Sequence, residues 1–126
     1  MKNNTDSRFD LDLSFGVNME NKLLKALEST IEVKSERDKW LKTGNIAVEY
    51  MSREMPSGIL VTEADHWTHV LTINGKPYCY LIFPTPVMKK IVSHYREHKP
   101  ETIRRGGDHN TSEMVLLPLR DIVLPK

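Results

Sequence analysis

The sequence lacks several features that would assign it to a specialised class of protein. It has a single cysteine, Cys79, which excludes a disulfide framework and a cysteine zinc site. Because Cys79 lies in the apolar run YCYLIFP, we expect a reduced, buried side chain in a cytosolic protein. No stretch approaches the ~20 consecutive apolar residues of a membrane span, and MKNNTDSRFD lacks the apolar core of a signal peptide. These absences predict a cytoplasmic protein without a membrane partner.

The sequence also lacks an excess of charge of either sign. Its 18 Lys and Arg residues nearly balance 17 Asp and Glu residues, for a net charge of +1. Affinity for nucleic acid therefore requires basic residues to be gathered on one side of the molecule. There is no internal repeat and no low-complexity tract. With 126 residues, we expect a flexible N-terminus at 1–8 and a single domain at 9–126.

Apolar periodicity predicts alternating helices and strands around an apolar centre. Helical spacing is found at residues 17–28 and 86–98. A two-residue period or an unbroken apolar run predicts strands at 9–15, 29–36, 44–52, 78–87 and 113–123. The fold class is therefore α/β or α+β, with a central mixed β-sheet flanked by helices.

Several details of this arrangement are more specific. Strands 29–36 and 44–52 suit a hairpin with a long loop, although parallel neighbours remain an alternative. Thr62 followed by Asp65 predicts a capped, short helix within TEADHWTHVL. The run YCYLIFPTPV fits a central strand covered on both faces, whereas Pro118 indicates that the last strand lies near an edge.

An acid and an amine stand two residues apart in the first of these strands. In a strand, Glu32 and Lys34 project to the same side. Glu49 projects away from the apolar face of the next strand, and Glu20 lies on the apolar stripe of the preceding helix. If these elements meet, three carboxylates and one lysine converge on one face of the sheet.

Such a cluster needs protons or a cation, since clustered carboxylates repel one another in a low dielectric. Oxygen-only ligands suit a hard divalent cation, Mg²⁺ or Mn²⁺, rather than zinc. A bound cation polarises a phosphate and acidifies a water, and an adjacent lysine orients that water or stabilises developing charge. The pattern indicates phosphodiester hydrolysis.

The same residues carry a family resemblance. The E-x-K of IEVK, an acid on the preceding helix and a following strand with its own acid together resemble the PD-(D/E)XK nuclease superfamily, which includes restriction enzymes and Holliday-junction resolvases. Across the middle third of the chain, the combination E-V-K, T-G-N, E-Y, P-S-G-I and T-x-A-D-x-W is similar to a small phage-borne branch of it. The resemblance implies a restriction-endonuclease-like fold, a divalent metal and a DNA substrate, in the host-cell cytoplasm if the gene is phage-borne.

The chain departs from the family pattern at one acid. The superfamily usually carries an aspartate on a strand before the E-x-K strand, whereas here only STI separates Glu28 from Glu32. Glu49 is the favoured replacement; of Asp10 and Asp12, Asp12 is the better alternative. We therefore expect Glu32 and Glu49 to bind the metal with Glu20 or Asp12, and Glu32, Glu49 and Lys34 to be catalytic.

Basic and hydroxyl side chains in the flanking loops are candidates for DNA contacts. They are Arg37, Lys42, Thr43, Arg53, Ser57, Thr62, Arg104 and Arg105, the last two in a predicted polar loop, RRGGDHNTS. Each set also has a purely structural interpretation as a turn, a cap or a solvated surface.

Because a chain this small has one site, cutting both strands of DNA favours a homodimer.

Two other interpretations of the whole chain remain besides a nuclease. A protein that keeps the nuclease fold but lacks turnover, and binds DNA or protein, is the main alternative to the enzyme. An unrelated α/β adaptor with a surface Glu32–Lys34 ion pair is the third.

Overall fold

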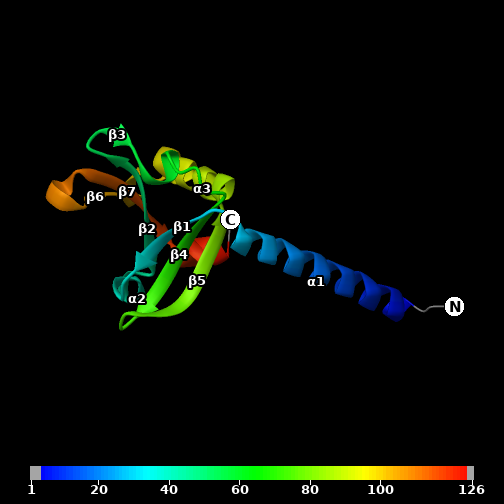
Figure 1. Ribbon diagram of the computed structural model, residues 1–126. Coiled ribbons are helices and arrows are strands. Elements are labelled where there is room, and N and C mark those ends of the chain that lie inside the picture. The colour runs from blue at the N-terminus through cyan, green and yellow to red at the C-terminus, as the bar shows by residue number, and fades with distance from the viewer. Residues whose placement is uncertain (1–3, 125–126) are drawn as a thin grey trace. The chain divides into compact units, whose positions relative to one another are not determined.

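The computed structural model describes residues 4–124, and side chains from residue 8 onward (Figure 1). The chain divides into two compact units, the first ending at Thr30 and the second beginning at Ile31. The first unit is one long helix, α1 (Asn4–Glu28). The helix predicted at 17–28 is confirmed, but the extended segment predicted at 9–15 is wrong because these residues belong to α1. A helix satisfies its backbone hydrogen bonds locally, whereas a strand needs a partner.

The N-terminal boundary predicted at residue 8 stays a prediction. Residues 1–3 lie outside the described part of the chain, and residues 4–8 belong to α1. No helix within residues 4–124 is both long and apolar enough to cross a lipid bilayer.

The second unit contains two β-sheets. In sheet A, β1 (Ile31–Glu36) runs parallel to β4 (His66–Ile73), and β4 pairs antiparallel with β5 (Lys76–Pro84). Sheet B is antiparallel and has the order β3-β2-β7-β6. Its strands are β2 (Asn45–Ser52), β3 (Met55–Pro56), β6 (Ile103–Gly106) and β7 (Ser112–Pro118).

Helices and short turns complete the second unit, so the fold is mixed α+β, in agreement with the predicted class. The α-helices are α2 (Lys39–Thr43), α3 (Thr85–His98) and α4 (Leu119–Val123). The 3₁₀ turns are η1 (Gly58–Leu60), η2 (Pro100–Thr102) and η3 (Asp108–Asn110).

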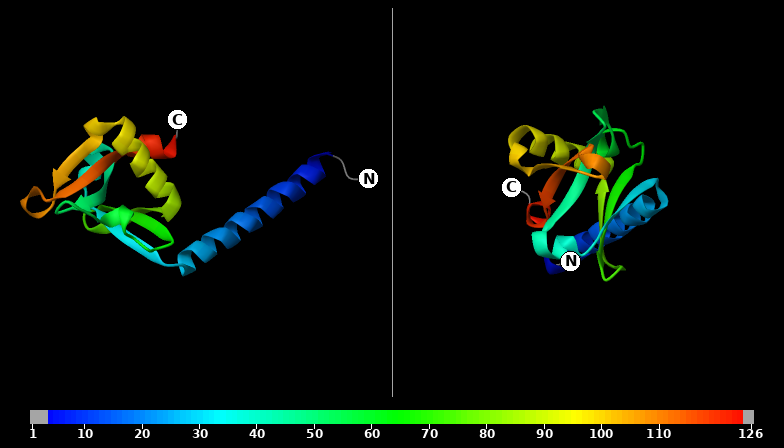
Figure 2. Two further views of the ribbon diagram at one scale, coloured as in Figure 1. Left: turned by 90° about the horizontal axis from the view of Figure 1, so that it is seen from above. Right: turned by 90° about the vertical axis from the view of Figure 1, so that its left-hand side faces the viewer.

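The main core forms where the two sheets pack against α3 (Figure 2). Sheet B contributes alternate residues of β2 and β7, whereas α3 contributes one stripe. The fully or nearly buried side chains are Ile46, Val48, Tyr50, Ile59, Trp67, Leu71, Met88, Val92, Tyr95, Val115 and Leu117. Trp67 is the largest of the fully buried side chains in this core.

Four predicted elements differ in the structure. The segment TEADHWTHVL forms a strand, β4, rather than a helix, because Trp67 and Leu71 alternate toward the core. β1 pairs with β4 and not with β2. β5 is an edge strand whose Tyr78 and Tyr80 are exposed, whereas β7 is internal and Pro118 only ends it. Parallel pairing between strands far apart in the sequence leaves no local sequence pattern, so the sequence could not predict which strands are neighbours in a sheet.

Candidate functional site

β1 turns its charged side chains toward the interior. The parallel register pairs three charged residues of β1 with three buried residues of β4: Glu32 with Trp67, Lys34 with His69, and Glu36 with Leu71. Paired residues project to the same side of a sheet. Val33 projects to the other side and is 56% exposed. The prediction that Glu32 and Lys34 share a face is therefore confirmed, and that face is the inner one.

Glu32 is held as a carboxylate by two neighbours. The hydroxyl of Thr62 donates to Glu32 Oε1 at 3.0 Å, and Lys34 Nζ lies 3.2 Å from Glu32 Oε2. The hydrogen bond from Thr62, followed by that from Lys34, lowers the pKa of the Glu32 carboxyl below its ordinary value, although partial burial opposes the shift. Glu32 is thus negatively charged at neutral pH and partly open to solvent.

Lys34 lies between a carboxylate and an aromatic ring. Its Nζ is 5.4 Å from the centroid of the Trp67 ring, within range of a cation–π interaction. Its side chain is 42% exposed, so the ammonium group is accessible from solvent. This position lets Lys34 reach a ligand bound at Glu32.

Glu49 projects from β2 on the face opposite to Val48 and Tyr50, as predicted. Ser57 Oγ donates to Glu49 Oε2 at 2.9 Å. The two predicted catalytic carboxylates therefore come from different sheets, and each is bound by a hydroxyl group.

One short loop, residues 57–62, connects these two carboxylates. The Ser57 amide donates to Tyr50 O at 2.9 Å, which continues the free edge of β2. The loop makes one 3₁₀ turn at η1 and ends at Thr62, whose hydroxyl reaches Glu32. Gly58 packs so closely on β2 that a Cβ atom there would collide with the Glu49 carbonyl group. The loop therefore contacts both side chains, Glu49 through Ser57 and Glu32 through Thr62.

The roles predicted for Ser57 and Thr62 change accordingly. Thr62 does not cap a helix, since the next element of the chain is the strand β4. Its Oγ1 instead accepts a hydrogen bond from the Ala64 amide at 3.2 Å, as in a turn. Both hydroxyls bind carboxylates in the structure, and their contact with phosphate stays a prediction.

The donor set at this loop fits Mg²⁺ or Mn²⁺ in chemistry. Two carboxylates and two hydroxyls are hard oxygen donors, and Mg²⁺ is commonly held by one or two carboxylates together with water and substrate phosphate. Among the described residues, no three His, Cys, Asp or Glu side chains form a group that could hold a metal by themselves. Asp12 and Glu20 lie on α1 in the other unit, so their part in a metal site stays a prediction.

A buried hydrogen-bond chain supports the same strand, and sequence reasoning missed it. Trp67 Nε1 donates to His69 Nε2 at 2.8 Å, and His69 Nδ1 lies 2.9 Å from Glu36 Oε1. Because Nε2 accepts, the proton of a neutral His69 sits on Nδ1 and is donated to Glu36. Glu36 Oε1 also accepts from the Ala47 amide at 3.3 Å, which links sheet A to the edge of β2. The continued alternation E-x-K-x-E was the available signal.

His66 and His69, whose spacing of three residues would suit metal ligands on a helix, do not lie on one face. The two residues lie three apart on a strand and therefore project to opposite faces of β4. His69 is fully buried and hydrogen-bonded, as described above.

Several predicted DNA contacts line one groove of about 440 Å³. Thr43, Arg104 and Arg105 line it together with Lys39 and Glu36. Arg104 and Arg105 belong to β6 rather than to a loop, so the loop prediction is wrong there. The other predicted basic contacts, Arg37, Lys42 and Arg53, are exposed and do not line the groove.

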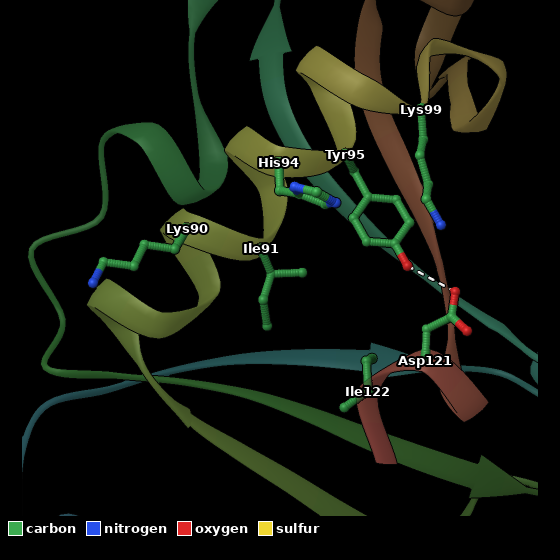
Figure 3. A pocket seen from close by; sticks show the side chains of 7 residues that line it. All are labelled: Lys90, Ile91, His94, Tyr95, Lys99, Asp121 and Ile122. Carbon is green, nitrogen blue, oxygen red and sulfur yellow. Dashed lines mark hydrogen bonds between the residues drawn. The ribbon is translucent and has the colours of Figure 1, made fainter. Parts of the chain in front are cut away.

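A second cavity, of about 310 Å³, lies between α3 and α4 (Figure 3). Tyr95 donates its hydroxyl proton to Asp121 Oδ2 at 2.9 Å. Burial, and then this hydrogen bond, raise the pKa of Tyr95 to about 12. Asp121 is the one carboxylate among the residues that line this cavity, and it already accepts a hydrogen bond, so the cavity offers no second acid for a metal.

The candidate functional site thus consists of Glu32, Lys34 and Glu49, held by the loop at 57–62, with the basic groove on sheet B beside it. Comparison of the chain with protein-family models, with curated proteins and with solved structures finds no match.

Proposed function

We propose that the protein is a metal-dependent endonuclease of the PD-(D/E)XK type that hydrolyses phosphodiester bonds of DNA in the cytoplasm. The observation that carries this proposal is the placement of Glu32 and Lys34 on the inner face of β1, with Glu49 joined to them through one loop. An acid that remains ionised, a second acid and an accessible ammonium group are the side chains that metal-assisted hydrolysis needs.

Each residue has a separate role in this proposal. Glu32 and Glu49 hold Mg²⁺ or Mn²⁺, whereas the parts predicted for Glu20 and Asp12, which lie on α1, stay predictions. The cation supplies Lewis acidity at the phosphate and acidifies water. Lys34 hydrogen-bonds the attacking water or stabilises negative charge, since it lies on the same face as Glu32 and is accessible. Thr62 and Ser57 keep the two carboxylates oriented.

The DNA substrate is supported by the basic groove. Lys39, Arg104 and Arg105 line it, and cationic side chains provide most of the sequence-independent affinity for phosphates. Cutting both strands of a duplex requires two sites, so the active species on duplex DNA is proposed to be a symmetric homodimer. Sedimentation of the protein on duplex DNA tests this, and a complex containing only one protein chain would count against the dimer.

The test of activity uses near-isosteric variants. The native chain, Glu32→Gln, Glu49→Gln and Lys34→Met are incubated with linear duplex, flap and four-way-junction DNA in Mg²⁺ or Mn²⁺. Each substitution is expected to reduce the cleavage rate by at least about 100-fold, since each removes a charge that acts at the reacting phosphate.

Matched controls carry the same changes outside the site. Glu97 and Lys89 are exposed residues of α3, so Glu97→Gln and Lys89→Met should leave cleavage unchanged. Tryptophan fluorescence verifies that every variant is folded. Cleavage that survives Glu32→Gln and Lys34→Met in the folded protein would refute the proposed site.

The ion pair between Lys34 and Glu32 favours a second candidate function. At 3.2 Å, Lys34 already neutralises one of the two carboxylates, as expected of a nuclease fold that binds DNA or protein without turnover. Calcium distinguishes the two, because it commonly occupies carboxylate sites without supporting hydrolysis. Binding of DNA in Ca²⁺, Mg²⁺ and Mn²⁺ with cleavage in none of them would establish the binding module instead.

A further inference from the structure

The groove on sheet B has a mixed chemical lining that phosphate binding alone does not explain. Its floor is formed by Ala47, Met114 and Leu116, which lie on the face of the sheet opposite to the α3 core. Trp40 forms part of its wall, and cationic residues lie at its rim. An apolar floor with an aromatic wall suits a flat, partly apolar group, whereas the rim suits an anion.

The aromatic wall is fixed in place. Trp40 Nε1 donates to Thr72 O at 2.9 Å, and the Trp40 ring packs against Tyr78 at a centroid distance of 5.8 Å. A ring held in this way keeps its orientation when a ligand binds, so little conformational entropy is lost.

Two polar groups of the groove have hydrogen-bonding capacity left over. Glu36 Oε1 accepts from His69 and from Ala47, while Glu36 Oε2 accepts no hydrogen bond from any described residue. The carboxamide of Asn45 likewise has no hydrogen-bond partner within residues 4–124. A fixed carboxylate and an amide can read the edge of a nucleobase, because carboxylates accept from exocyclic amino groups and amides both donate and accept.

The rim can hold a phosphate beside that base. Arg104 Nη1 donates to the carbonyl groups of Glu101 and Ile103, at 2.6 and 2.9 Å. These bonds fix the guanidinium group and leave other N–H donors for a phosphate, since arginine has five. Lys39 lies at the same groove.

We propose that this groove binds one unpaired nucleotide of a DNA strand, with its base against Trp40 and the apolar floor. The base presents an exocyclic amino group to Glu36, so cytosine and adenine are preferred to thymine. Asn45 contacts the base edge, and Lys39 and Arg104 bind the adjacent phosphate. The inference rests on the proposed function for its substrate, and it identifies that substrate as DNA with an unpaired nucleotide near the cleaved bond.

The position of the groove relative to the carboxylates agrees with this substrate. Ala47 and Glu49 project from the same face of β2, two residues apart. Two residues of a strand span about 7 Å, and successive nucleotides of one DNA strand are spaced by about 3.4 Å along a duplex. A base in the groove therefore places a phosphodiester bond one or two nucleotides away close to Glu49. Flaps, junctions and single strands provide such a nucleotide without the cost of unpairing it.

Binding is measured without divalent metal, so that it is independent of cleavage. The fluorescence anisotropy of labelled six-nucleotide dC, dA and dT strands is followed with the full chain in EDTA. We expect dC and dA to bind at least about fivefold more tightly than dT. Glu36→Gln should abolish this preference, and Asn45→Ala, which spares the His69 hydrogen bond, should weaken dC binding by about fivefold or more.

The cationic rim has its own readout. Lys39→Ala should lower the slope of the logarithm of the binding constant against the logarithm of salt concentration by about 0.7, the value for one phosphate contact on a single strand. Lys89→Ala on exposed α3 is the matched control and should leave the slope unchanged.

Failure of this inference is distinct from failure of the proposed function. Equal affinity for dC and dT, or Asn45→Ala and Glu36→Gln variants that bind like the native chain, would overturn the nucleotide groove even if DNA is cleaved. Tighter binding of the corresponding RNA would overturn the assignment to DNA. Loss of the preference for dC over dT in Glu36→Gln, together with weaker dC binding by Asn45→Ala, in a protein that cleaves no DNA, would support the groove while refuting the nuclease.

Discussion

Replacing Gly58 by alanine tests whether the loop at 57–62 is pressed against β2. Gly58 has a φ of +51°, and a Cβ atom there would lie inside contact distance of the Glu49 carbonyl oxygen and 2.9 Å from its carbonyl carbon. The colliding atoms are backbone, so no side-chain rotation relieves the contact. Gly58→Ala must therefore move the loop, β2 or both.

The expected cost has two parts. An L-residue in the left-handed region loses about 1–2 kcal/mol, and forcing an extra carbon into a packed site costs a further ~1–3 kcal/mol. The free energy of unfolding should thus fall by roughly 2–5 kcal/mol. In a domain of this size each kcal/mol corresponds to about 4–8 °C, so Tm should fall by about 10 °C or more.

Gly75→Ala is the matched control. Gly75 has a φ of +78°, but a Cβ atom there meets nothing within 4 Å. It should lose only the conformational part, about 1–2 kcal/mol. Urea unfolding of both variants, followed by tryptophan fluorescence, gives the difference. If Gly58→Ala is no more destabilised than Gly75→Ala, the loop does not pack on Glu49 as described, and the link between the two carboxylates is lost.

Three further changes probe the hydrogen bonds. Thr62→Val removes a hydrogen bond to Glu32 and should therefore raise the pKa of the Glu32 carboxyl. Because a lowered carboxyl pKa stabilises the fold above the unfolded value of about 4.5 and this stabilisation is lost as the pH falls, the variant should lose less stability than the native protein on acidification. An NMR titration in which the Glu32 carboxyl is unchanged by the substitution would contradict this. Glu36→Leu should cost about 1–3 kcal/mol in urea unfolding, because it leaves the buried N–H of His69 unpaired; a neutral effect would mean that water replaces the carboxylate. The pKa of Tyr95, raised to about 12, stabilises the fold below pH 10, and this stabilisation is lost as the pH rises from 10 to 12. Tyr95→Phe should therefore reduce the fall in the free energy of unfolding over that pH range by about 2 kcal/mol. Identical alkaline unfolding profiles of the two proteins would refute this.

The sequence predicted the elements of the fold better than their pairing. The strand at Ile31–Glu36, the strand at Asn45–Ser52 and the helix at Thr85–His98 follow from local periodicity and are confirmed. The predicted pairing of β1 with β2 was wrong. β1 pairs with a strand more than 30 residues away, and no local sequence pattern encodes that pairing. The helix predicted at 62–71 shows the same limit: Thr62 and Asp65 look like a cap, but tertiary packing of Trp67 decided in favour of a strand.

The candidate site was predictable in its side-chain types and not in its supports. Sharing of a face by Glu32 and Lys34 follows from strand geometry alone. The bonds from Ser57 and Thr62, and the chain from Trp67 through His69, join residues distant in sequence. Such contacts depend on the tertiary fold, and only the alternation E-x-K-x-E hinted at the third charged residue of the row.

The orientation of β1 is the strongest physical reason to seek a function at Glu32 and Lys34. A slip of one residue would exchange the faces of the strand, burying Val33, which is 56% exposed, and exposing the charges, with a gain of about 1–2 kcal/mol for the valine alone. A strand carrying a merely structural surface ion pair would adopt that register. Here the charged row faces the interior instead, and partners on other elements satisfy it. Local sequence rules are expected to be broken in this way where side chains serve chemistry rather than stability.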